Sequence, residues 1–144
     1  MMLMVIDSSV IVKWFFLESL TQEALAIRQD WLTYKVDLIA PELILAEVGN
    51  IVWKKHRLGL ITEQEGIDML SDLLALNLLT VSTEILLPIA YNLATEFDRT
   101  VYDSLYLGLA QSRGVKFITA DLRLYNSVHS KLNFVEYLGN YQLP

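Results

Sequence analysis

Short apolar runs alternate with helix-forming segments along the whole chain, and this alternation most constrains the fold. The runs are predicted strands because they are brief and rich in apolar or β-branched residues. They are Leu3–Ile6, Val36–Ala40, Leu79–Ser82, Val115–Thr119 and Phe134–Tyr137. Strands that are apolar throughout are typical of a parallel sheet covered on both faces. We therefore predict an α/β three-layer sandwich, with a central parallel sheet of about five strands flanked by helices.

Helical patterns fill the intervals between the predicted strands. Ser19–Gln22 and Thr62–Glu65 each resemble a capping box, in which two side chains cap the first turn of a helix. Pro41 suits the first turn of a helix that runs towards Arg57. The later helices are expected at Glu84–Phe97, Val101–Arg113 and Leu122–Ser130. The consecutive helices between residues 41 and 75 predict a helical hairpin that protrudes from the sheet.

The length and composition indicate one domain. The chain has 144 residues, of which 53% are hydrophobic, and no linker or repeat divides residues 1–144. It has no cysteine, which excludes disulfides and thiolate metal sites. The longest stretches without charge, Leu73–Thr83 and Ile85–Thr95, span 11 residues each and are too short to cross a bilayer. We expect a cytoplasmic protein without membrane association.

Four acidic residues stand where they could meet at one edge of such a sheet. Asp7 follows the first predicted strand and Asp121 follows the fourth. The carboxyl ends of parallel strands lie at a common edge, where ligands bind in open α/β folds. Asp103 lies in the first turn of a predicted helix, and Glu47 shares the apolar face of another. Converging carboxylates repel one another unless a hard divalent cation neutralises them, so the pattern indicates a metal-dependent phosphodiester hydrolase.

Each of these acids also has an ordinary structural interpretation. Asp7 and Asp121 could cap the helices that follow them, because Asp is favoured at those positions. Asp103 could simply complement the dipole of its helix. Glu47 could be an exposed helical residue, although the residues three before and four after it are isoleucines. A carboxylate on an apolar face needs a partner, and a metal ion is one candidate.

Four motifs together resemble a known family. They are Asp7-Ser8-Ser9-Val10, Pro41–Glu47, Tyr102–Ala110 and Thr119-Ala120-Asp121, in this order along the chain. The set is similar to the PIN-domain nucleases, and most similar to the VapC-like toxin branch of type II toxin–antitoxin systems. The resemblance implies that Asp7, Glu47, Asp103 and Asp121 form the catalytic and metal-binding site. It assigns supporting hydroxyls to Ser8, Ser9 and Thr119.

The same resemblance implies a function. The chain would be an endoribonuclease that cleaves single-stranded or loop RNA, with Mg²⁺ or Mn²⁺ positioning the phosphate and activating a water molecule. Its partners would be RNA and an antitoxin protein. Two alternatives remain open: a PIN-fold interaction module, and a housekeeping RNA-processing nuclease without a toxin role. A haloacid-dehalogenase-type phosphatase fits poorly, because it would need Asp-x-Asp where this chain has Asp7-Ser8-Ser9.

The basic residues and the apolar surface bear on partners. The formal net charge of −6 is unusual for a protein that binds phosphates. Lys13, Lys54, Lys55 and Arg57 are the candidates for RNA contacts, although the run at 54–57 could instead complement the dipole at a helix end, which we favour. The high hydrophobic content, including Trp14–Leu17, predicts a homodimer.

Overall fold

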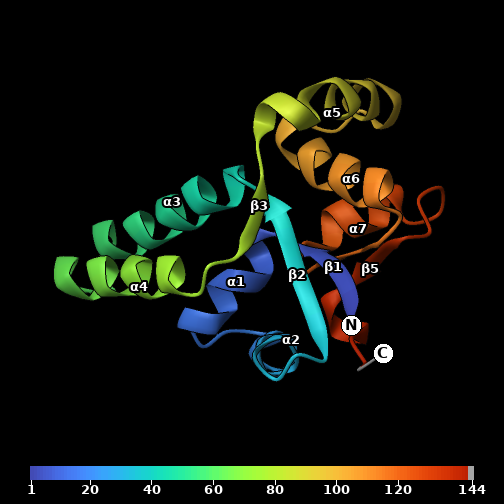
Figure 1. The fold of residues 1–144 in the computed structure, drawn as a ribbon. Helices are drawn as coiled ribbons and strands as arrows, with labels where there is room; N and C mark the ends of the chain where they lie inside the picture. Colours follow the sequence, from blue (N-terminus) through green and yellow to red (C-terminus); the bar gives the residue numbers. More distant parts are fainter. Residues whose placement is uncertain (143–144) are drawn as a thin grey trace.

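The computed structural model describes residues 1–142, and within them it forms a five-stranded parallel sheet in the order β3-β2-β1-β4-β5 (Figure 1). The strands are β1 (Met2–Ile6), β2 (Val36–Pro41), β3 (Leu79–Val81), β4 (Lys116–Thr119) and β5 (Val135–Tyr137). Each lies where the sequence predicted a strand, with ends shifted by only one residue. All four strand pairings are parallel. The predicted parallel sheet is confirmed.

Helices cover both faces of this sheet. They are α1 (Ser8–Phe15), α2 (Thr21–Leu32), α3 (Leu43–Arg57), α4 (Glu63–Ala75), α5 (Thr83–Phe97), α6 (Val101–Arg113), α7 (Leu122–Val128) and the short 3₁₀ helix η1 (Leu138–Asn140). Figure 1 shows α1 to α4 on one side of the sheet and α5 to α7 on the other. The helices α3 and α4 lie side by side and project away from the sheet, as predicted. The three-layer α/β architecture is confirmed.

The order of the strands creates a switch point between β1 and β4. From β1 the chain moves outward through β2 to β3, and then returns to place β4 on the other side of β1. In open α/β sheets, such a reversal opens a crevice at the carboxyl ends of the two central strands. Ile6 pairs with Ile118, so the next residues, Asp7 just after β1 and Thr119 at the end of β4, lie side by side. Topology alone brings these two distant positions together.

The two strands that flank this crevice are anchored in the core. Val5 and Ile6 of β1 and Phe117 of β4 are fully buried. Burying one such side chain stabilises the fold by roughly 1.5–3 kcal/mol, so the strand ends that carry the polar residues are held firmly. Leu107 on α6 is also fully buried. The polar residues therefore begin where a close-packed core ends.

The two predicted capping boxes had different outcomes. At Thr62 the capping box is confirmed, since its hydroxyl accepts from the Glu65 N–H and the Glu65 carboxylate accepts from the Thr62 N–H. At Ser19 the prediction is wrong, because α2 is preceded by Leu20 in a left-handed conformation with φ of 64°. The Thr21 hydroxyl is used elsewhere: it donates to the carbonyl of Phe16 at 3.2 Å. Ser19 and Gln22 have the side chains that a capping box needs, but the left-handed turn at Leu20 prevents Ser19 from capping α2.

Two predicted helix ends also moved. Pro41 is the last residue of β2, in register with Val81, and α3 begins only at Leu43. The fixed φ of proline suits the end of a strand as well as a first helical turn. The last helix ends at Val128 rather than at Ser130. Across the described residues, no helix combines the length and apolar character needed to span a membrane.

Candidate active site

Asp7 is the most buried carboxylate of the site. It follows β1 and its side chain is only 6% exposed. Its Oδ1 accepts a hydrogen bond from the Ser9 hydroxyl, and its Oδ2 accepts one from the Thr119 hydroxyl, each at 2.5 Å. Asp7 stands at the N-cap position of α1, but its carboxylate makes no capping bond there. Capping is therefore not what the side chain of Asp7 does in this fold.

Both hydroxyls are oriented by backbone amides that follow β4. The Ala120 N–H donates to the Ser9 oxygen at 2.9 Å, and the Asp121 N–H donates to the Thr119 oxygen at 3.0 Å. A hydroxyl that accepts from a fixed amide has its own hydrogen left to donate, and here that hydrogen is directed at Asp7. The ends of β1 and β4 are thus joined through one carboxylate.

Burial changes the acidity of this group. The pKa of Asp7 is raised from 3.8 to about 7, chiefly by removal from water and to a smaller extent by the negative charges of Glu47 and Asp121. The hydrogen bonds from Ser9 and Thr119 act in the opposite direction, because they favour the charged form. Desolvation is the largest effect. The side chain is therefore a carboxyl group whose ionisation falls within the neutral range.

Glu47 faces Asp7 from the next layer. It lies on α3, half-buried, and its Oε1 accepts from the Tyr106 hydroxyl at 2.5 Å. The Ser8 hydroxyl is a weaker partner at 3.5 Å. Burial raises the pKa of Glu47, and the nearby charge of Asp103 adds to the increase. The reading of Glu47 as an ordinary exposed helical residue is therefore wrong.

The other two acids begin helices. Asp103 lies in the first turn of α6, which Thr100 caps through the Asp103 N–H. Its Oδ2 accepts from the Arg99 guanidinium at 3.0 Å. Asp121 caps α7, because its Oδ1 accepts from the Leu124 N–H at 3.1 Å. The capping interpretation of Asp121 is confirmed for one of its two carboxylate oxygens.

The four acids lie in one electrostatic neighbourhood. Asp7 feels the charges of Glu47 and Asp121, and Glu47 feels the charge of Asp103. Within residues 1–142, however, no three His, Cys, Asp or Glu side chains are gathered closely enough to hold a metal ion. The fold brings the acids together around the switch point without closing a ligand set. Their catalytic and metal-binding roles stay predictions.

Comparisons with known proteins assign the chain to a family. The family model described as PIN domain matches residues 4–128. This chain belongs to the PIN-domain family. It is 34% identical over 126 residues to Ribonuclease VapC3 of Pyrobaculum aerophilum, covering 85% of this chain and 92% of that protein. The resemblance to the VapC-like branch is confirmed.

A solved structure shows the same fold. The crystal structure of PAE2754 from Pyrobaculum aerophilum matches 96% of this chain and 85% of its own, with a TM-score of 0.66 at 20% sequence identity. Such a low identity supports the PIN-like architecture and nothing finer.

Two residues of this PIN-domain site were missed by sequence reasoning. Arg99 received no role from the sequence, yet it binds Asp103. The four-residue spacing of the pair, at the start of a helix, was the available signal. Tyr106 received no role of its own, yet its hydroxyl holds Glu47. Buried tyrosines usually find a partner for the hydroxyl, and an acid predicted on the neighbouring layer could have suggested one.

The basic candidates divide into two groups. Lys13 is buried, and its ammonium binds Glu18 at 2.9 Å, so its charge is already paired within the protein and its contact with RNA stays a prediction. The other three lie at the end of α3: Lys54 is exposed, Lys55 lies over the Phe16 ring, and Arg57 lies over the Trp53 ring.

The residues of the PIN-domain site suit a hard divalent cation in their chemistry. The site offers several oxygen groups: four carboxylates and the hydroxyls of Ser8, Ser9 and Thr119. Mg²⁺ and Mn²⁺ prefer such ligands. A cation would also favour the ionised form of Asp7, which burial disfavours. The donor set fits, and binding would require the carboxylates to approach one another more closely.

Proposed function

We propose that this protein is a divalent-metal-dependent endoribonuclease that cleaves single-stranded or loop RNA. The observation that carries the proposal is the buried Asp7, held by two oriented hydroxyls at the switch point and surrounded by three further carboxylates. Membership of the PIN-domain family and similarity to a protein named Ribonuclease VapC3 support the same reaction. A bound Mg²⁺ or Mn²⁺ supplies charge neutralisation at the phosphate and activation of water.

The protein side chains prepare the site for that chemistry. Ser9 and Thr119 fix the direction of both Asp7 oxygens and stabilise its ionised form. Tyr106 fixes Glu47 in the same way. Arg99 neutralises Asp103, which reduces repulsion within the cluster. These contacts hold the carboxylate groups in orientation before substrate arrives, which lowers the reorganisation needed at the moment of reaction.

The end of α3 is the surface we assign to the RNA backbone. Lys54, Lys55 and Arg57 provide positive charge on a chain that is acidic overall, and Trp53 presents an exposed ring beside them. Positive side chains attract phosphates, and an exposed ring can stack on an unpaired base. Single-stranded RNA is the substrate that such a surface favours.

The biological setting forms a second part of the proposal. We infer a toxin role in the cytoplasm, with an antitoxin protein as inhibitor and a homodimer as the working form. Similarity to the VapC-like branch supports the toxin role. Exposed apolar side chains on α5, including Ile85 and Tyr91, support a dimer. Sedimentation at tens of micromolar (about the range in which a stable interface is populated) should show a dimer, and a monomer alone would contradict it.

Cleavage assays on Asp7→Asn and Asp103→Asn test the catalytic proposal. Both variants should lose nearly all cleavage of a single-stranded RNA in Mn²⁺, since Asn keeps the shape but not the charge. Asp72→Asn, on the exposed surface of α4, is the matched control and should cleave normally. Chelator should abolish wild-type cleavage, and added Mn²⁺ should restore it. Unchanged cleavage in both site variants would refute the assignment and favour an interaction module.

A further inference from the structure

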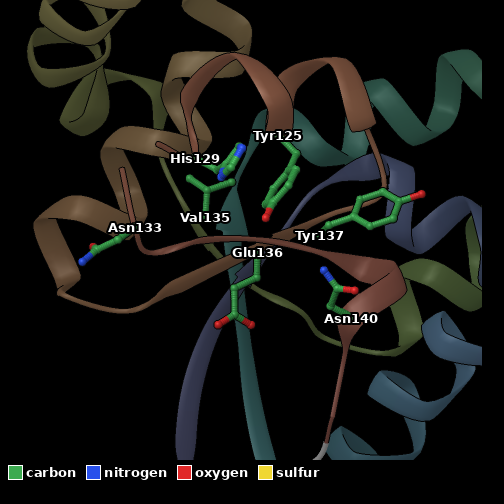
Figure 2. Close-up of a pocket in the computed structure, with 7 residues that line it drawn as sticks. All are labelled: Tyr125, His129, Asn133, Val135, Glu136, Tyr137 and Asn140. Atoms are coloured by element: carbon green, nitrogen blue, oxygen red, sulfur yellow. The ribbon is translucent and has the colours of Figure 1, made fainter. Parts of the chain in front are cut away.

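A cavity of about 360 Å³ lies along the edge strand β5, outside the acidic cluster. Its walls come from α7, from β5 and from the turns around them. Six of the residues that line it are Tyr125, His129, Asn133, Glu136, Tyr137 and Asn140 (Figure 2). None of these residues has a role in the proposed chemistry. The cavity is large enough for a planar heterocycle together with ordered water.

Aromatic rings form one wall of this pocket. The Tyr125 ring stacks on the His129 ring with centroids 4.4 Å apart and an angle of 6°. Figure 2 shows Tyr125 of α7 and His129, at the end of that helix, beside β5. The Tyr137 ring lies 5.8 Å from that of Tyr125, tilted by 44°. Gly139 makes room for the Tyr137 ring, since a Cβ there would lie 2.6 Å from its Cε2 atom. The rings are therefore held in place as a stacking platform.

Polar groups surround the platform. His129, Asn133 and Asn140 are exposed, and Asn amides present both a donor and an acceptor, as the edges of nucleobases do. Glu136 is the one acid among the six lining residues named above, and it is paired with Lys116 at 3.1 Å. That pairing reduces its repulsion of a phosphate. A stacking surface with amide groups beside it matches the chemistry of a single unpaired base.

The pocket adjoins the acidic cluster through one turn of α7 and through the pairing of β4 with β5. Tyr125 lies one helical turn beyond Asp121, and its N–H donates to the Asp121 carbonyl at 3.0 Å. One turn of an α-helix advances about 5.4 Å. Tyr137 is in register with Thr119, the residue whose hydroxyl binds Asp7. A strand of RNA whose phosphate reaches the carboxylates could thus place a neighbouring base over β5.

We propose that this pocket binds the base of a nucleotide adjacent to the cleaved phosphate, with Tyr125 as the main stacking residue. The inference rests on the proposed function, because it takes RNA as the ligand. It adds a site that reads or anchors one base, separate from the carboxylates that act on the phosphate. The pocket would set the position of cleavage relative to that base.

A binding experiment tests the pocket without relying on cleavage. The probe is a fluorescently labelled single-stranded RNA, intact or carrying one abasic site at each position in turn. Titration uses the Asp7→Asn protein in Mn²⁺, so that the RNA stays whole. Adding Tyr125→Leu should weaken binding of intact RNA by about five- to a hundredfold, the usual effect of losing one base stack. Tyr125→Phe, which keeps the ring, and Tyr34→Leu, in the exposed turn between α2 and β2, should bind like the parent.

The decisive result is the combination of the two changes. An abasic site at one position should weaken binding to the parent protein, and the Tyr125→Leu protein should lose nothing further from it. Gly139→Ala should give a similar pattern by displacing the Tyr137 ring, which covers the case in which Tyr125→Leu fails to fold. Two results would overturn the pocket. One is that the abasic site weakens binding by the same factor in the parent and in the Tyr125→Leu protein at every position. The other is that the two proteins bind intact RNA equally well.

Cleavage separates this proposal from the catalytic one. Suppose that wild type cleaves no RNA, but the abasic site at one position weakens binding only when Tyr125 is present. The pocket then stands and the nuclease assignment fails. If instead wild type cleaves RNA, but the abasic site weakens binding equally with and without Tyr125 at every position, the nuclease assignment stands and the pocket fails.

Discussion

The buried carboxyl group of Asp7 should make the metal-free protein less stable as the pH rises. In the folded chain its pKa is about 7, against 3.8 for an ordinary aspartate, chiefly because burial removes the charge from water. Between these two pH values the folded protein holds a proton that the unfolded chain has released. The free energy of unfolding must therefore fall as pH rises through this window. Stability from this group is fully present below pH 4 and lost by about pH 8.

The size of the effect follows from the interval between the two pKa values. Each pH unit in which one proton differs changes the free energy of unfolding by about 1.4 kcal/mol. From 3.8 to about 7 this sums to about 4 kcal/mol, a large share of the roughly 5–15 kcal/mol that stabilises a domain. Glu47, whose pKa is also raised, adds to the loss in the same direction.

Asp7→Asn should remove the contribution of Asp7 without changing the shape of the side chain. Urea unfolding in chelator, from pH 4 to pH 8, measures it. At pH 4 variant and wild type should be similarly stable, because Asp7 is then largely uncharged when folded. At pH 8 the variant should be more stable by as much as about 4 kcal/mol. Asp72→Asn is the control and should follow the wild-type curve. Parallel curves for wild type and Asp7→Asn would refute the reasoning.

Three further predictions concern metal, packing and the partly buried ion pair of Lys13 with Glu18. In Mn²⁺ at a hundred times its dissociation constant, the free energy of unfolding of wild type should rise by about 2.7 kcal/mol, and that of Asp7→Asn should rise clearly less. Equal rises in a melting assay would contradict a metal site at Asp7. Gly49→Ala on α3 should add up to about 1 kcal/mol because nothing lies within 4 Å of the new Cβ. Gly108→Ala on α6 should not stabilise the fold, because its Cβ would lie 2.9 Å from Ile89. A gain in unfolding free energy equal to that of Gly49→Ala would contradict this, since it would mean that α5 and α6 separate freely. Glu18→Gln should lower the free energy of unfolding by about 1–3 kcal/mol, because it leaves the buried Lys13 ammonium without its carboxylate. Lys13→Met should lower it less. Chemical unfolding that ranks the two variants the other way would disprove this account.

Sequence reasoning located the strands well because burial on both faces leaves a strong local signal. The run Leu3–Ile6 is apolar throughout and too short to form a helix, so it is recognisable as a strand from the sequence alone. Helix starts were less predictable. The Ser19 pattern resembled a cap, but the conformation of Leu20 decided the matter, and that depends on how α1 packs against α2.

The sequence by itself determined the alternation of elements, the family and the identity of the four acids. Those properties are written in residue type and spacing, which are local. Only the tertiary structure decided the partners: Thr119 and Ser9 on Asp7, Tyr106 on Glu47, and Glu18 on Lys13. Two of these four pairs, Thr119 with Asp7 and Tyr106 with Glu47, join segments far apart in the chain, so their contact depends on strand order and on which helix face is buried. Burial also set the acidity of Asp7, because the cost of removing a charge from water depends on everything packed around it.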